Sequence, residues 1–151
     1  HLGEKQHWGK WPGWQRSTQV PLLILPPSGS KGRFAINATC DTPVSLIDLY
    51  PTLVDLCGLK QVHRLDGQSL RLQLTKPEAA SNRLVVTTFD KGNHTLSGTN
   101  WRYIRYSDGS EELYDRKNDP HEWTNLAAKH NHAKTVSRFA KALDLKLRKT
   151  K

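Results

Sequence analysis

The sequence has few cysteines and no long apolar run, and each shortage excludes a class of protein. Only Cys40 and Cys57 occur among 151 residues; they are able to pair, but two cysteines establish no disulfide framework. Their separation does not fit a CxxC redox or zinc motif. Because no run of about 18 apolar residues is present, we expect no membrane-spanning helix and no membrane partner.

The sequence also lacks a recognisable signal peptide. Its first residue is His1 rather than Met, so we expect further protein sequence, with any targeting signal, upstream. The 151 residues fit one domain, and the hydrophobic fraction of 36% and charged fraction of 25% are typical of a globular chain. The sequence alone does not indicate in which cellular compartment the protein is found.

Acidic residues are scarcer than basic ones, and the formal net charge is +9. Most of this excess lies in residues 129–151, where Asp144 is the only acidic residue. The basic residues there are Lys129, Lys134, Arg138, Lys141, Lys146, Arg148, Lys149 and Lys151. Such a stretch is able to attract anionic glycan, lipid or nucleic acid, although a charge run on an amphipathic helix is more often a solvated face. We expect no specific nucleic-acid partner.

Hydrophobic periodicity predicts the elements of the first half. The continuous apolar run over residues 20–25 indicates a buried strand of a mostly parallel sheet. Apolar residues at helical spacing over 44–59 predict a helix that begins near Asp48. Pro51 would then lie in the first turn, and Gly58 would cap the end.

The second half predicts a small antiparallel sheet and a helix. Strands are expected over 84–89 and 101–106, the second of them half-exposed, and Asp108-Gly109 indicates a hairpin turn before a return strand at 111–114. From about His132, the apolar spacing predicts an amphipathic helix whose polar face carries most of the lysines. This order is typical of an α/β piece joined to an α+β piece.

Short motifs occur in a fixed order along the chain. They are Leu2-Gly3-Glu4 with Trp8-Gly9-Lys10, Val20-Pro21-Leu22 followed by Ser45-Leu46-Ile47-Asp48-Leu49-Tyr50-Pro51-Thr52-Leu53, and Glu112-Leu113-Tyr114-Asp115 with Asn118-Asp119-Pro120 and Glu122-Trp123-Thr124-Asn125-Leu126-Ala127. Together they resemble the C-terminal portion of sulfatases in the alkaline-phosphatase-like superfamily. Gly92-Asn93-His94 and Trp101-Arg102-Tyr103 are most similar to the iduronate-2-sulfatase-like group.

The resemblance implies an α/β fold in two parts. Residues 1–62 would end the catalytic domain and contribute one strand and one helix to its large sheet. Residues 63–151 would form a C-terminal subdomain, a small antiparallel sheet packed on the terminal helix. The strand edge at residues 20–25 would then be exposed, so we expect the chain to self-associate through it.

The same resemblance implies hydrolysis of sulfate monoesters, with sulfated sugars or glycosaminoglycans as substrates. Sulfatases use a formylglycine made from a C/S-x-P-x-R motif, together with a divalent cation, usually calcium. Cys40 and Cys57 are followed by Asp41-Thr42-Pro43 and Gly58-Leu59-Lys60, so neither matches the motif. The Asp-His metal ligands would lie just before His1. We therefore expect the isolated chain to be inactive and to bind no cofactor.

One family active-site position is present, because Lys10 matches the lysine of the Trp-x-Lys motif and by resemblance contacts the sulfate. Weaker candidates for substrate binding are His94, placed in a loop between two strands, and also Trp8 and Arg102. An ordinary polar role is the alternative for His94 and Arg102. The cluster Trp8, Trp11 and Trp14 is able either to stack on sugar rings or to pack beneath the active-site loop.

Two other functions remain open from the sequence. The first is a non-enzymatic module that binds polyanions or glycans through the tryptophans and the basic C-terminal stretch. The second is a phosphatase or phosphonate hydrolase of the same superfamily, which differs from a sulfatase at the nucleophile. The sulfatase resemblance implies an exported, periplasmic or lysosomal location.

Overall fold

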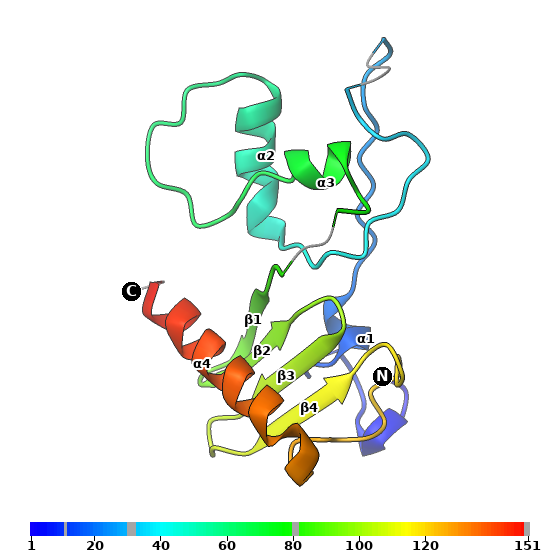
Figure 1. Cartoon of the computed structure of the whole chain (residues 1–151), viewed down its shortest axis with the longest axis vertical. Coiled ribbons are helices and arrows are strands. Elements are labelled where there is room, and N and C mark those ends of the chain that lie inside the picture. The colour runs from blue at the N-terminus through cyan, green and yellow to red at the C-terminus, as the bar shows by residue number, and fades with distance from the viewer. Residues whose placement is uncertain (11, 30–32, 80–81, 150–151) are drawn as a thin grey trace. The chain divides into compact units, whose positions relative to one another are not determined.

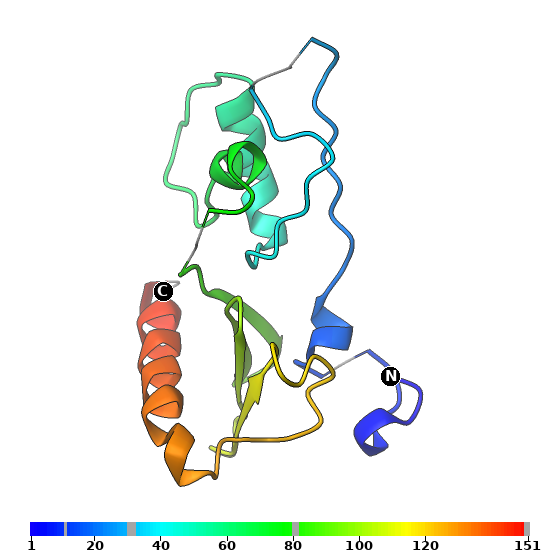
Figure 2. The same cartoon turned by 45° about the vertical axis from the view of Figure 1, so that its right-hand side comes forward.

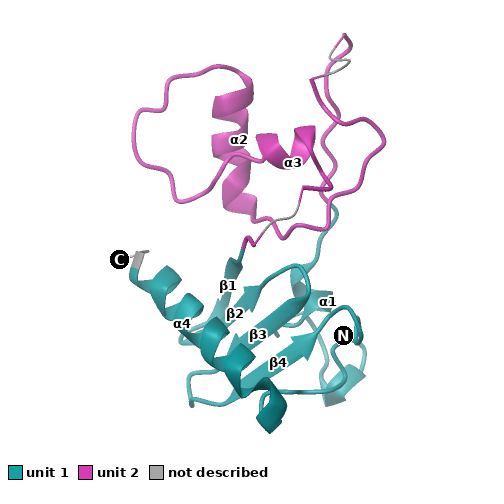
Figure 3. Cartoon of the chain, in the orientation of Figure 1, with its two compact units in different colours: residues 1–21, 84–151 teal, residues 22–83 magenta. Residues whose placement is uncertain are grey.

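The computed structural model describes residues 1–10, 12–29, 33–79 and 82–149 and divides the chain into two compact units (Figure 3). Unit 1 consists of residues 1–21 and 84–151, and unit 2 of residues 22–83. The N-terminal segment belongs to unit 1 because it packs on the sheet of the second half of the chain, through contacts that sequence patterns do not reveal. The boundary expected between residues 62 and 63 concerns the parts of a larger enzyme and stays a prediction.

Unit 1 is built on a four-stranded antiparallel sheet in which the strands follow one another in sequence order (Figure 1). The strands are β1 (Val85–Asp90), β2 (Asn93–Ser97), β3 (Trp101–Arg105) and β4 (Glu111–Asp115). Leu96 pairs with Val86 and with Tyr103, and Tyr103 pairs with Leu113, so these apolar side chains form a row on one face. β1, β3, the hairpin turn and β4 were predicted, whereas β2 was not.

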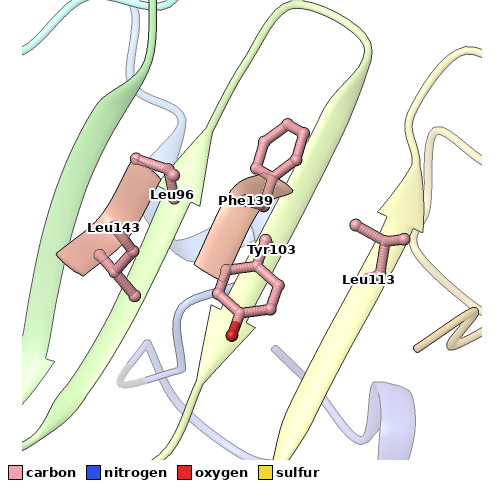
Figure 4. Packing of buried hydrophobic residues seen from close by; sticks show 5 residues of the cluster. All are labelled: Leu96, Tyr103, Leu113, Phe139 and Leu143. Carbon is pink, nitrogen blue, oxygen red and sulfur yellow. The ribbon is translucent and has the colours of Figure 1, made fainter. Parts of the chain in front are cut away.

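Helix α4 (Ala133–Lys149), which follows the short helix η3 (His130–His132), covers this apolar row. Figure 4 shows Phe139 and Leu143 of α4 packed against the side chains of the strands. The buried cluster consists of Leu96, Tyr103, Leu113, Phe139 and Leu143. The predicted amphipathic helix is therefore confirmed, and its apolar stripe supplies the core of unit 1.

The N-terminal segment covers the opposite face of the same sheet, as the turned view shows (Figure 2). It contains the short helices η1 (Glu4–Gln6) and α1 (Gln15–Thr18). Arg102 of β3 donates from Nη1 to the carbonyl of Gly13, 3.0 Å away, and Arg102 is 3% exposed. The prediction that this strand is half-exposed was wrong, because both of its faces are covered.

Unit 2 consists mostly of loops around η2 (Leu46–Asp48), α2 (Leu49–Leu56) and α3 (Arg71–Thr75). The buried carboxylate of Asp48 accepts hydrogen bonds from the backbone amides of Ser45 at 2.7 Å and Gln68 at 2.9 Å. Pro51 lies in the first turn of α2, and Gly58 follows its end with a φ of 64°. The predicted helix and both of its boundary signals are confirmed, whereas α3 was not expected.

The apolar run at residues 20–25 is not a strand in this structure. Leu23 and Leu25 are 79% and 85% exposed, and within the described part of the chain no strand pairs with the run. A strand exists only through its hydrogen-bonded partner, so apolar composition alone did not create one. Cys40 and Cys57 are free thiols. Within the described residues, no helix is both long enough and apolar enough to cross a membrane.

Candidate active-site loop

Residues 1–9 form a loop that is closed by backbone hydrogen bonds at its base, and we call it the closed loop. His1 donates from its backbone nitrogen to the carbonyl of Gly9 at 2.8 Å, and Gly9 donates back to His1 at 3.0 Å. A further bond of 3.1 Å runs from Gly3 to His7. Lys10 directly follows Gly9, one of the two residues that form this base.

The tip of the closed loop is anchored by the ammonium of Lys5. Lys5 and Gln6 adopt left-handed backbone conformations, with φ of 53° and 58°. The ammonium lies 4.2 Å from the ring centroid of Trp14 and 4.1 Å from that of Tyr114. It also donates a hydrogen bond of 2.8 Å to the Tyr114 hydroxyl. Burial lowers the pKa of Lys5, and the nearby carboxylate of Glu112 partly opposes this effect.

Glu112 of β4 holds the two aromatic rings in place. Its Oε2 accepts hydrogen bonds from Trp14 Nε1 at 2.7 Å and from the Tyr114 hydroxyl at 2.8 Å. Burial and the charge of Glu112 raise the pKa of Tyr114, so its hydroxyl stays protonated. Trp14 thus packs beneath the closed loop, which decides between the two roles that the sequence left open for this residue.

An ion pair within unit 1 attaches the residues after the closed loop to the sheet. Arg102 Nε donates to Glu122 Oε1 at 2.6 Å, and Arg102 Nη1 donates to the Thr18 hydroxyl at 3.0 Å. The second carboxylate oxygen of Glu122 accepts from the backbone amide of Gln15 at 2.8 Å. Burial lowers the pKa of Arg102, whereas Glu122 raises it. The pair therefore joins α1, β3 and the turn after β4.

The structure places the predicted site residues in three different surroundings. Lys10 and Trp8 are exposed on the same short segment, Trp8 with 73% of its surface accessible. Arg102 is enclosed in the ion pair described above. His94 lies in strand β2 and not in the predicted loop. Trp11 lies outside the described residues.

His94 is on the sheet face that α4 covers, because it pairs with Arg105, whose guanidinium reaches Asp144 of α4 at 2.8 Å. His94 Nδ1 is 2.8 Å from the hydroxyl of Thr88, and burial lowers the pKa of the imidazole. The closed loop packs on the opposite face, so His94 lies apart from Trp8 and Lys10, which are near neighbours in sequence. A substrate contact by His94 or Arg102 stays a prediction.

Sequence reasoning missed Lys5, Glu112 and Glu122 as the groups that hold the loop. Glu112 and Glu122 belong to motifs that indicated only a family resemblance. No sequence pattern indicated a role for Lys5. No group of three or more His, Cys, Asp or Glu side chains among the described residues is arranged to hold a metal ion.

Comparisons with known proteins identify the family. The profile of the family described as N-sulphoglucosamine sulphohydrolase, C-terminal, matches residues 3–150. A sulfatase of Formosa agariphila is 38% identical over 126 residues, which cover 83% of this chain and 24% of that protein. Arylsulfatase K of Bos taurus is 32% identical over 160 residues, covering 96% of this chain and 28% of that protein.

A solved structure described as a 2-O GAG sulfatase superposes with a TM-score of 0.56 and 29% identity, covering 68% of this chain and 24% of that one. The chain thus spans about a quarter of the length of the relatives that it matches. The sequence motifs, the α/β fold and these likenesses agree. The chain belongs to the N-sulphoglucosamine sulphohydrolase C-terminal family and is a C-terminal portion of a sulfatase.

Proposed function

We propose that this chain is part of an enzyme that hydrolyses sulfate monoesters of sulfated sugars, and that Lys10 contacts the sulfate group. The observation that carries the proposal is the closed loop. Its base joins His1 to Gly9 by two hydrogen bonds, and Lys10 directly follows Gly9, so the backbone of Lys10 lies near His1. By the sulfatase resemblance, the Asp-His metal ligands of the complete enzyme would lie just before His1.

Lys10 suits this role because its side chain is exposed and therefore accessible to a substrate. Among the described residues, no hydrogen bond or ion pair to its side chain is found. A sulfuryl group carries negative charge that an approaching nucleophile must overcome, and a compact cation with three rotatable donors stabilises it. We infer that Trp8, exposed two residues earlier, contacts the sugar ring that bears the sulfate.

The remaining catalytic groups would come from residues other than those described here. By the sulfatase resemblance, a formylglycine would supply the nucleophile there, and a divalent cation, usually calcium, would supply positive charge for the sulfuryl oxygens. The substrate class is supported by the neighbour described as a 2-O GAG sulfatase. The assignment to an iduronate-2-sulfatase-like group and an exported or lysosomal location stay predictions; the curated relatives include several forms of arylsulfatase K.

The test is steady-state kinetics of the complete enzyme with Lys10→Ala and with the matched control Lys91→Ala, which alters an exposed lysine of the β1–β2 turn. We expect Lys10→Ala to lower kcat/KM for an aryl sulfate by about 100- to 1000-fold, as for loss of one transition-state donor. Lys91→Ala should leave it unchanged. Equal activity of the two variants would refute the role of Lys10, and faster hydrolysis of the matching aryl phosphate would refute the sulfatase assignment.

A further inference from the structure

The outward face of α4 carries a straight row of positive charge that the loop site does not use. The row consists of Lys134, Arg138, Lys141 and Arg148, and we call it the basic stripe. These positions are separated by one or two helical turns, so the four side chains project from one side of the helix. All four are exposed, whereas Phe139 and Leu143 on the other side are buried.

The stripe keeps its charge because the only carboxylate of α4 is engaged elsewhere. Asp144 Oδ1 accepts a hydrogen bond of 2.8 Å from Arg105 of β3, which forms an ion pair with it. Arg138 lies over the ring of Phe139 at 5.2 Å from the centroid and remains exposed and charged. Among the described residues, no carboxylate forms an ion pair with a member of the stripe.

From this arrangement we propose that the basic stripe is a second binding surface, which holds a linear sulfated glycan chain away from the closed loop. From Lys134 to Arg148 the stripe is about 21 Å long at the rise of an α-helix. A row of that length complements a linear polymer with repeated negative groups better than it does a single small anion.

The composition of the stripe favours a glycan over other polyanions. Proteins that bind single-stranded nucleic acid present aromatic rings for base stacking, and the stripe presents none. A helix that lies on a membrane needs a continuous apolar face beside its cations, and Leu145 is the only large apolar side chain exposed between members of the stripe.

The stripe and the closed loop lie on opposite sides of the sheet of unit 1, since α4 covers one face and the N-terminal segment the other (Figure 2). A short oligosaccharide held at Lys10 therefore does not reach the stripe. The surface would act by retaining a long chain, and this role does not depend on the proposed sulfate-ester hydrolysis.

The test is isothermal titration of the purified 151-residue chain with long heparin chains, at several salt concentrations. The stripe variant carries Lys134→Gln, Arg138→Gln, Lys141→Gln and Arg148→Gln together. The control variant loses the same number of charges from exposed residues outside α4: Lys60→Gln, Arg64→Gln, Lys91→Gln and Lys117→Gln. Circular dichroism checks that both variants retain the helix content of the parent chain.

We expect the stripe variant to bind heparin at least about tenfold more weakly than the control variant, with a smaller dependence on salt. An equal loss of heparin affinity in the two variants would overturn the proposal, because the attraction would then come from the net charge of the chain alone. Tighter stripe-dependent binding of single-stranded DNA, or of phosphatidylcholine–phosphatidylserine vesicles, would overturn the glycan assignment. The kinetic test of Lys10→Ala and this binding test use different variants and different readouts, so failure of the active-site proposal is distinguishable from failure of this one.

Discussion

Arg102 and Glu122 form an ion pair in which the two side chains are 3% and 1% exposed and the Nε–Oε1 distance is 2.6 Å. Glu122 adopts a left-handed backbone conformation with a φ of 59°, which places its carboxylate between Arg102 and the amide of Gln15. Because Arg102 also binds the carbonyl of Gly13, the pair couples the N-terminal segment to the sheet. The position of the segment that follows the closed loop thus depends on contacts between residues far apart in sequence.

Replacing Arg102 alone should destabilise unit 1 strongly. Arg102→Met leaves the carboxylate of Glu122 buried without its cation, and loss of one partner of a buried pair costs about 3–5 kcal/mol. The matched control is Arg71→Met, which removes the ion pair with Asp55 whose side chains are 41% and 38% exposed; because solvent screens this pair, its loss should destabilise the chain much less. Urea unfolding followed by circular dichroism measures both, and similar costs would contradict the structural role of the buried pair.

Elements with local signals were predicted correctly from the sequence. Helix α4 has a sustained apolar stripe, α2 begins with Asp48 and Pro51 and is followed by Gly58, and the β3–β4 hairpin has Asp108-Gly109. Strand β2 was missed because it begins with Asn93, His94 and Thr95 and has no apolar run. Its side chains are covered only because both faces of the sheet are packed.

The candidate site was only partly predictable, because several of its contacts join residues that are far apart in sequence. Lys10 was proposed through a motif, which needs no knowledge of packing, and its role stays a prediction. The anchor of the closed loop joins Lys5 to Tyr114, 109 positions away, and no periodicity connects such residues. Arginine is usually an exposed residue, and only the three-dimensional structure shows that Arg102 is buried in an ion pair with Glu122.

At Gly13 the backbone of the N-terminal segment lies close to side chains of the sheet. A Cβ at this position would lie 2.6 Å from Cε1 of Phe89 and 3.2 Å from Cβ of Thr95. Gly13→Ala should therefore destabilise the chain by about 1–3 kcal/mol through overpacking. The double variant Gly13→Ala/Phe89→Leu should regain part of this loss relative to Phe89→Leu alone. A thermal unfolding series measures the four proteins, and simple additivity would contradict a direct clash.

The ammonium of Lys5 should control how tightly the closed loop is held. Lys5→Met keeps most of the apolar stem and removes the cation–π contacts, each worth about 0.5–2 kcal/mol, and the bond to Tyr114. We expect faster hydrogen exchange of the amides of Gly3 and Gly9, measured by NMR, and unchanged exchange in α4. Lys117→Met, at an exposed lysine, is the control. Unchanged protection in the Lys5 variant would show that backbone bonds alone hold the loop.

Three tyrosines should make unit 1 sensitive to alkaline pH. Burial raises the pKa of Tyr103, Tyr106 and Tyr114, and the carboxylates of Glu111 and Glu112 add to the effect. In the unfolded chain, a tyrosine ionises near pH 10. Because the folded pKa values are higher, this contribution to stability is complete below about pH 10 and is lost as the pH rises through the folded values.

The lowered pKa of Lys5 makes the free energy of unfolding increase with pH, which opposes the effect of the tyrosines. Lys5 is a single group, however, whereas three tyrosines contribute to the decrease. Above about pH 10.5, each tyrosine should therefore reduce the free energy of unfolding by up to about 1.4 kcal/mol per pH unit. Tyr103→Phe should flatten this decline, whereas Tyr50→Phe, at a ring that is 60% exposed in unit 2, should not change it. Urea unfolding at a series of alkaline pH values measures the slopes. Identical slopes for the two variants would contradict a role for the buried Tyr103 hydroxyl, because its interaction with Glu111 exists only in the folded protein.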